Sequence, residues 1–514
     1  MRSDLAVVTQ GKHEKPFTDG SWLRILLAFV ALHLLAPDAS AQDRIQAPVE
    51  QRGFAALTAY DTLQSFLASI NGRGPITVRR IAATRQGRSV FACLISSSSR
   101  FGDDTTKLRV MLFAQQHGDE PAGKEALTML LANIASGAMR EILSRIDLLV
   151  IPQMNPDGSE LRQRRTSDSI DLNRNHLLLT SPETKGLHDL FGQWWPHVTM
   201  DLHEFGAFSR SWSDSGIAKT VDVQLGMLTN LNSSEALRTY QRRLVFPYVA
   251  EQMRQQSYSL HEYIVGSPAD RIRYSTTEIN DGRQSFGILN TLSFIQEGRG
   301  GKELEDRLER RARSQLASVE ALLRYCAAHA QEIRSLVAYE RGRLRDLGGR
   351  PVVLAMDHFP GGGDLRIPVR SISSGRDSLW KVRPLHDVVK PIINTTLPSS
   401  YVVPRQFDSI VKLLERHNVQ REVVQVEQTV TAGVYAIDTV RADTLEEEWH
   451  PRPALRLETR SVSLHPGDLL VSTKQYHSLF LAILLEPQSM WGLVKYPGYE
   501  YLLKENVFPI LRIP

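Results

Sequence analysis

The sequence predicts an α/β protein with a layered sheet over most of its length, followed by a smaller β-rich domain. Up to about residue 344, apolar runs that suit buried strands alternate with amphipathic runs of helical spacing. Beyond residue 345, short β-branched runs broken by Gly, Pro and Asp replace that alternation. The length of 514 residues is about three times that of a typical domain, which favours more than one unit.

The elements follow one another in a regular order. Residues 56–70 have apolar positions at helical spacing, and residues 76–97 are predicted to form two strands joined by a turn at Gln86-Gly87-Arg88. Further strands are predicted at 108–116, 147–155, 197–203 and 289–297. Further helices are predicted from Pro121 to about 135 and at 182–194, 236–258 and 303–339. In the β-rich part, one short helix is predicted at about 405–417.

Composition excludes several classes of protein. Hydrophobic residues make up 42% and charged residues 23% of the chain, which excludes disorder over most of its length. The formal net charge is only +4, and no run of basic residues is interleaved with aromatic residues, so nucleic acid is a poor candidate partner. Two cysteines exclude a disulfide scaffold and a cysteine-rich zinc module.

The N-terminus carries the pattern of a secretory signal. Residues 25–35 form an eleven-residue apolar run, too short for a bilayer, which needs about 20 residues. Basic residues precede the run, and Ala39-Ser40-Ala41 follows it as a small-x-small cleavage pattern. We therefore predict a signal peptide at 1–41, cleavage after Ala41, a periplasmic or secreted protein and no later membrane span. A buried helix or an uncleaved anchor is the alternative.

Export would place both thiols in an oxidising compartment. Cys93 lies in an apolar strand and Cys326 in an amphipathic helix. A disulfide between them is one outcome, and two separate buried thiols is the commoner one. The sequence does not show whether the two residues meet.

Metal-ligand residue types follow two of the predicted strands. His117 and Glu120 come after strand 108–116, and His203 ends strand 197–203. Two imidazoles and a carboxylate, with a fourth position open to water, are a common catalytic zinc set. Because α/β sheets build their sites at the carboxyl ends of strands, we expect these three side chains to converge. Glu297 ends strand 289–297, where it suits a general base or, alternatively, an ion pair with Arg299.

A loop between these ligands is rich in arginine. It begins with the turn Asn155-Pro156-Asp157-Gly158, and its cations are Arg162, Arg164, Arg165 and Arg174. Near a zinc site, arginine offers bidentate binding for a carboxylate, although such a loop is also typical of a solvated surface. Asp171 suits a carboxylate that orients a ligand histidine through its second ring nitrogen.

Taken together, these motifs resemble the zinc carboxypeptidase family typified by carboxypeptidase A. The resemblance covers about residues 50–340 and implies a mixed central sheet flanked by helices for the domain 42–344. The β-rich domain 345–514 is similar to the tail of some secreted bacterial members. The strings that carry the resemblance, in the order of the family, are QQHGDEPAG, NPDG, DLNRN, DLHEFG and SFIQEGRG.

The resemblance implies a role for each candidate residue. One zinc ion per chain would be held by His117, Glu120 and His203, with Asp171 behind His117 and Glu297 as the general base toward a zinc-activated water. The remaining residues would bind a peptide or protein C-terminus: Asn173 and Arg174 its carboxylate, Arg164 or the competing Arg162 the scissile carbonyl, and Tyr274, the nearest candidate, the terminal residue.

The resemblance therefore implies a metallocarboxypeptidase that hydrolyses residues from peptide C-termini. Three alternatives remain at this point. The same fold serves amidohydrolases that cleave cell-wall murein peptides, and a similar ligand set serves deacylation of small N-acyl amino acids. A non-catalytic peptide-binding protein is the alternative from another class, although such a protein would be expected to lack a ligand or the base.

Overall fold

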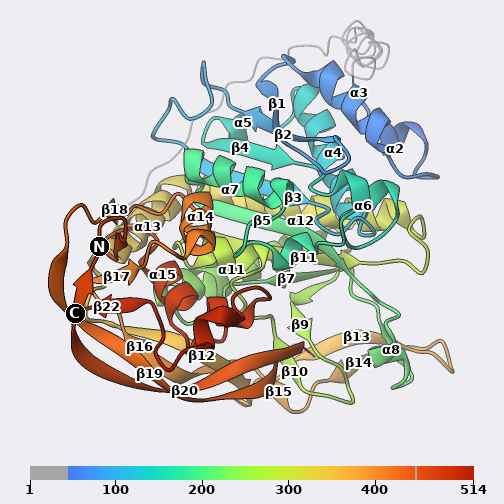
Figure 1. The fold of residues 1–514 in the computed structure, drawn as a ribbon. Coiled ribbons are helices and arrows are strands. Elements are labelled where there is room, and N and C mark those ends of the chain that lie inside the picture. The colour runs from blue at the N-terminus through green and yellow to red at the C-terminus, as the bar shows by residue number, and fades with distance from the viewer. Residues whose placement is uncertain (1–43, 446–447) are drawn as a thin grey trace, which may run out of the picture. The chain divides into compact units, whose positions relative to one another are not determined.

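An eight-stranded mixed sheet forms the centre of the computed structural model (Figure 1). Its strands are β1 (Ile76–Ala83), β2 (Ser89–Ile95), β3 (Leu108–Ala114), β4 (Ile146–Ile151), β5 (Val198–Phe205), β7 (Val223–Gly226), β8 (Leu260–Glu262) and β11 (Leu292–Arg299). They lie in the order β1-β2-β4-β3-β5-β11-β7-β8. The inner strands β4, β3, β5 and β11 pair in parallel, whereas β2 and β7 join them antiparallel on either side. The predicted α/β fold with a mixed sheet is confirmed.

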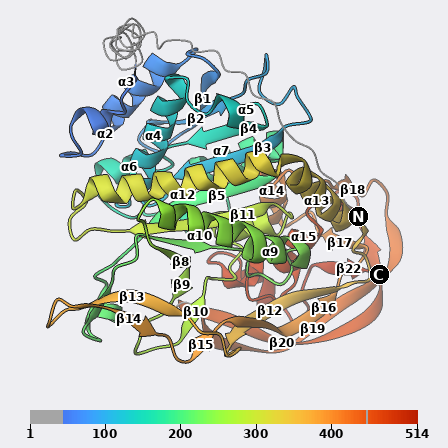
Figure 2. The same cartoon turned by 180° about the vertical axis from the view of Figure 1, so that it is seen from behind.

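Helices cover both faces of this sheet, which explains why the inner strands β4 and β5 are buried along their whole length. On the face toward the viewer in Figure 1, α7 (Pro182–Trp194) lies across the strands, and its Leu187 and Phe191 pack in one core with Phe113 and with Phe286 of α11 (Gly282–Gly287). Figure 2 shows α12 (Leu308–Ala328) on the opposite face. The other helices here are α2 (Pro48–Gln51), α3 (Tyr60–Ile70), α4 (Ala122–Ala135), α5 (Arg140–Leu143), α6 (Pro156–Glu160), α8 (Arg210–Ser213), α9 (Glu235–Tyr240), α10 (Phe246–Gln255) and α13 (Ala330–Arg343).

The C-terminal region is rich in strands, as predicted. The largest sheet has the order β18-β21-β17-β22-β19-β20, in which β19 (Gln428–Leu445) and β20 (Glu448–Leu464) form a long hairpin. The shorter members are β17 (Ser400–Val403), β18 (Glu422–Val423), β21 (Leu469–Ser472) and β22 (Leu511–Ile513), and β12 (Pro351–Phe359) pairs separately with β16 (Val388–Thr396). Two helices pack here, the predicted α14 (Asp408–Arg416) and an unpredicted α15 (Ser478–Leu485).

The β-rich region shares elements with the part that precedes it. The strand β13 (Arg366–Ser371) pairs with β14 (Asp377–Lys381) on one side and with β6 (Ile217–Lys219) on the other. Likewise, β15 (Leu385–His386) extends a small sheet formed by β9 (Ile264–Val265) and β10 (Ile272–Tyr274). Residues 46–514 accordingly form one compact unit. That residues 345–514 fold as a domain of their own stays a prediction.

The structure describes residues 44–445 and 448–514. The predicted signal peptide at 1–41 lies outside the described residues, so its cleavage and the export of the protein stay predictions. No helix in the described ranges is long and apolar enough to cross a bilayer. Cys93 and Cys326 are separate buried thiols, the commoner of the two expected outcomes, and burial raises the pKa of each to about 12.

Candidate active site

Three neighbouring parallel strands bring the predicted ligands and the predicted base to one end of the sheet. His117 follows β3, and His203 lies near the end of the adjacent β5. Glu297 lies in β11, directly opposite His203 in the parallel register. Because directly paired residues on adjacent strands point to the same face of a sheet, His203 and Glu297 face the same space.

His117, Glu120 and His203 converge on one point. The Nδ1 atoms of the two histidines are 3.1 Å apart, and each lies 2.8 or 2.9 Å from a carboxylate oxygen of Glu120. In tetrahedral zinc sites with bonds of about 2.0–2.1 Å, ligand atoms lie roughly 3.3 Å from one another. These separations are close to that value, and two nitrogens with a carboxylate are the donor types that zinc prefers. Within residues 44–445 and 448–514 this is the one group of this kind that could hold a metal ion.

The second nitrogen of each histidine faces a carboxylate. Nε2 of His117 lies 3.2 Å from Asp171 Oδ1, and Nε2 of His203 lies 2.9 Å from Asp201 Oδ2. Each carboxylate accepts a hydrogen bond from the ring N–H at Nε2. The proton therefore stays on Nε2, and the lone pair of each Nδ1 is directed at the metal position. Asp171 thus lies beside Nε2 of His117, and Asp201 is its counterpart at His203.

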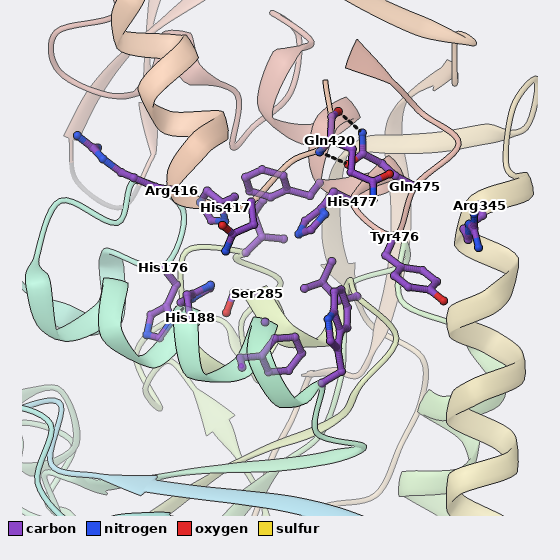
Figure 3. Close-up of a pocket in the computed structure, with 17 residues that line it drawn as sticks. His176, His188, Ser285, Arg345, Arg416, His417, Gln420, Gln475, Tyr476 and His477 are labelled. Atoms are coloured by element: carbon purple, nitrogen blue, oxygen red, sulfur yellow. Dashed lines mark hydrogen bonds between the residues drawn. The ribbon is translucent and has the colours of Figure 1, made fainter. Parts of the chain in front are cut away.

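Asp201 is held in turn by the buried amide of Gln116. Gln116 Nε2 donates to Asp201 Oδ2 over 2.7 Å, and Gln116 Oε1 accepts from His176 Nε2 over 2.8 Å. His176 also lies 3.0 Å from His188, and both line a cavity of about 400 Å³ between α7 and the C-terminal region (Figure 3). Burial lowers the pKa of His176 to about 3, so the ring is neutral and donates through one nitrogen only.

Glu297 is suited to exchange protons. Its side chain is buried within the site, and that burial raises the pKa of Glu297 to about 6. Tyr263 lies near Glu297: burial first, and then the charge of Glu297, raise the pKa of Tyr263. Arg299 makes no ion pair with Glu297 among the described residues, so the alternative role of Glu297 as a structural partner of Arg299 lacks support.

The turn predicted at 155–158 fixes the loop that carries His117. Asn155 caps α6 by accepting a hydrogen bond from Gly158 N over 2.8 Å, and its amide donates to Gln116 O over 3.1 Å. Gly118 packs directly on Gly158, since a Cβ on Gly118 would lie 2.1 Å from Gly158 C. Only glycine permits this approach of two backbones.

The structure distinguishes between the two competing arginines. Arg164 lies beside the metal ligands, with NH1 3.1 Å from His117 Nδ1 and Nε 3.0 Å from Asp171 Oδ2. Arg162 instead pairs with Glu305 at 2.5 Å, with 59% of its side chain exposed. Arg164 is therefore the arginine that lies beside the converging ligands.

Asn173 also borders the site. Its Oδ1 accepts from Gly282 N over 2.8 Å and from Gln116 Nε2, which leaves its NH₂ group, 3.3 Å from His203 Nε2, as the donor for other groups. The guanidinium of Arg174 donates to Asn173 O over 3.0 Å. An amide donor and a guanidinium thus lie side by side at the edge of the metal position.

Tyr274 lies in a different setting from the one expected of it. Its ring stacks under the guanidinium of Arg242 at 5.4 Å, and burial and Glu262 raise its pKa to about 12. Tyr263 is instead the tyrosine whose pKa is raised by the charge of Glu297, after the larger effect of burial. No sequence signal singled out Tyr263, whereas Asp201 had one, because it precedes His203 by two residues on the same face of a strand.

Comparison with known proteins finds a matching family, similar sequences and a similar structure. Residues 63–293 match the family described as zinc carboxypeptidase. The chain is 26% identical over 433 residues to carboxypeptidase 2 of Trichophyton rubrum, covering 81% of this chain and 79% of that protein. It is 31% identical over 134 residues to carboxypeptidase E of Caenorhabditis elegans, covering 22% and 28%. A solved structure, carboxypeptidase A of Helicoverpa armigera, is 15% identical, with a TM-score of 0.42 and coverage of 60% and 81%.

Proposed function

The chain belongs to the zinc carboxypeptidase family and is a peptide hydrolase, and on that premise we propose that it removes residues one at a time from the free C-termini of peptides. One observation carries this proposal: the convergence of His117, Glu120 and His203 on one point, with Glu297 paired opposite His203. The sequence also predicts a protein of the secreted bacterial type within this family, and that stays a prediction.

We propose that His117, Glu120 and His203 hold one zinc ion per chain. When bound, zinc supplies Lewis acidity, which lowers the pKa of water toward about 7 and polarises a carbonyl group. Asp171 and Asp201 accept hydrogen bonds from the Nε2–H groups of the two histidines. These bonds hold the rings in the orientation in which Nδ1 faces the zinc position.

Glu297 is the group placed to move the protons. Its carboxylate accepts a proton from the attacking water and later gives it to the leaving amine nitrogen. The guanidinium of Arg164, beside His117, donates hydrogen bonds to the oxygen that becomes negative in the transition state.

Asn173 and Arg174 would recognise the C-terminal carboxylate. The NH₂ of Asn173 and the planar guanidinium of Arg174 offer donors suited to two carboxylate oxygens. A C-terminal amide carries no charge and gains much less from the same donors.

Arg174→Ala tests this exopeptidase restriction. The wild-type protein is expected to cut a peptide with a free C-terminus about 10- to 100-fold faster, in kcat/KM, than its C-amidated twin, because a charge-assisted hydrogen bond contributes roughly 1.5–3 kcal/mol. Arg174→Ala should remove most of that difference by slowing only the free-acid peptide. Arg165→Ala, in the same loop, is the matched control. Equal rates on both peptides in the wild-type protein would refute the role given to Arg174.

Two tyrosine variants separate the candidates for contact with the substrate. Tyr263→Phe removes a hydroxyl near Glu297 and should lower kcat/KM about tenfold, the order of magnitude of one hydrogen bond to a charged group. Tyr274→Phe, whose ring keeps its contact with Arg242, should stay within about twofold of wild type. Steady-state kinetics on one free-acid peptide compares the two, and the reverse ranking would restore Tyr274 as the substrate-binding tyrosine.

A further inference from the structure

A cavity of about 260 Å³ at the carboxyl end of the central sheet is strongly basic. Its walls come from the loops after β5 and β11, the start of α12, β13 and the residue before β7, and they carry two carboxylates, Asp222 and Asp306. The cations that line it are Arg299, Lys302, Arg307, Arg310, Arg311 and Arg370.

Half of these cations are already neutralised by ion pairs. Arg310 holds Asp222 through two contacts of 2.7 and 2.9 Å, while Arg311 pairs with Glu204 and Arg370 with Asp377. The remaining acid, Asp306, accepts from the backbone N–H groups of residues 302 and 303 at 3.2 Å.

Arg299, Lys302 and Arg307 make no ion pair with any residue that the structure describes. Burial, and then the charges of neighbouring arginines, lower the pKa of Arg299, which reflects a positive potential in this cavity. A guanidinium nevertheless stays charged, so the cavity favours an anion.

The cavity lies next to the catalytic groups. Arg299 is two residues beyond Glu297 in β11, and its partner across the sheet, Phe205, is two residues beyond His203 in β5. Two residues of a strand span about 6.6 Å, so the cavity begins within reach of a peptide side chain two to four residues from the scissile bond. Phe208, 42% exposed, lies under both Arg299 and Lys302 at 5.9 and 5.3 Å and forms one wall.

We propose that this cavity binds the carboxylate of an acidic side chain on the peptide substrate, upstream of the scissile bond. The inference rests on the proposed carboxypeptidase activity and adds a preference for acidic residues at one upstream position. A free inorganic anion has the same chemistry, so the test must distinguish the two sources.

Pairs of peptides that differ only by Glu or Gln at one of the third to fifth positions from the C-terminus provide the test. At low salt and without phosphate, wild-type kcat/KM should be about three- to tenfold higher for Glu at one position, as expected for partly exposed ion pairs, and the preference should fall as salt rises. The double variant Lys302→Gln, Arg307→Gln should abolish the preference for Glu. Its kcat/KM for the Gln peptide should equal that of the wild-type protein. Both side chains are exposed, so the fold should tolerate the change. Arg324→Gln, elsewhere on α12, is the control.

Binding of the same peptide pairs to Glu297→Gln protein tests the cavity whether or not hydrolysis occurs. Tighter binding of the Glu peptide, lost in the Lys302→Gln, Arg307→Gln background, supports the proposal. Failure to cut any peptide would count against the carboxypeptidase assignment alone. Equal cleavage and equal binding of Glu and Gln peptides at all positions would overturn the inference, and binding of inorganic phosphate without a Glu preference would assign the cavity to a free anion.

Discussion

Glu297→Gln is expected to lower kcat by a factor of about 10²–10⁴, the usual contribution of a general acid–base group. Glutamine keeps the shape of the side chain but takes up no proton, so both proton transfers proposed for Glu297 are lost. The measurement is turnover of a free-acid peptide at substrate saturation, with zinc content determined on the same preparation.

Zinc content separates this effect from damage to the site. Glu297 faces the metal position from β11 without belonging to the group of converging ligands, so the variant should keep zinc at the wild-type level. The Glu297→Gln protein should also unfold at the wild-type temperature. Turnover within a few-fold of wild type, at full zinc occupancy, would mean that another group moves the proton.

His203→Ala is expected to abolish zinc binding and, with it, activity. The variant removes one of the three proposed ligands and leaves Asp201 without its imidazole partner. Asp201→Asn should have a smaller effect, because it leaves the ligand in place but weakens the hold on its Nε2 proton; carboxylates of this kind typically contribute 10- to 100-fold in metal affinity.

Elemental analysis and competition with a chelator rank the three proteins. The expected order of zinc affinity is wild type, then Asp201→Asn, then His203→Ala. His329→Ala replaces an exposed histidine on the surface and should behave as wild type. Full zinc occupancy of chelator-washed His203→Ala would refute the ligand assignment, and an Asp201→Asn variant of unchanged affinity would refute the role of that carboxylate.

Residues that belong to a local pattern could be predicted from the sequence. His117, Glu120, His203 and Glu297 all lie at or just beyond the ends of apolar strands, and the sheet brings such positions together whatever the details of the loops. The Arg162 and Arg164 alternatives could not be separated in this way, since both lie in one irregular loop. Only packing shows that Arg164 reaches His117 while Arg162 reaches Glu305.

Residues placed by long-range pairing escaped prediction. Tyr263 follows a three-residue strand and precedes two short strands whose sheet is completed by β15, more than 110 residues later in the chain. No local spacing encodes that arrangement. The helix α15 was missed for a different reason: its sequence SLFLAILL is apolar on every side and buried throughout, so it has no helical periodicity to detect.

Mass spectrometry of one peptide during digestion by the zinc-loaded protein tests the central claim most directly. The account predicts a ladder of products, each shorter by one residue at the C-terminus, and no ladder with the C-amidated twin over the same time. Fragments that arise from internal cleavage, or equal loss of residues from the amidated peptide, would contradict it.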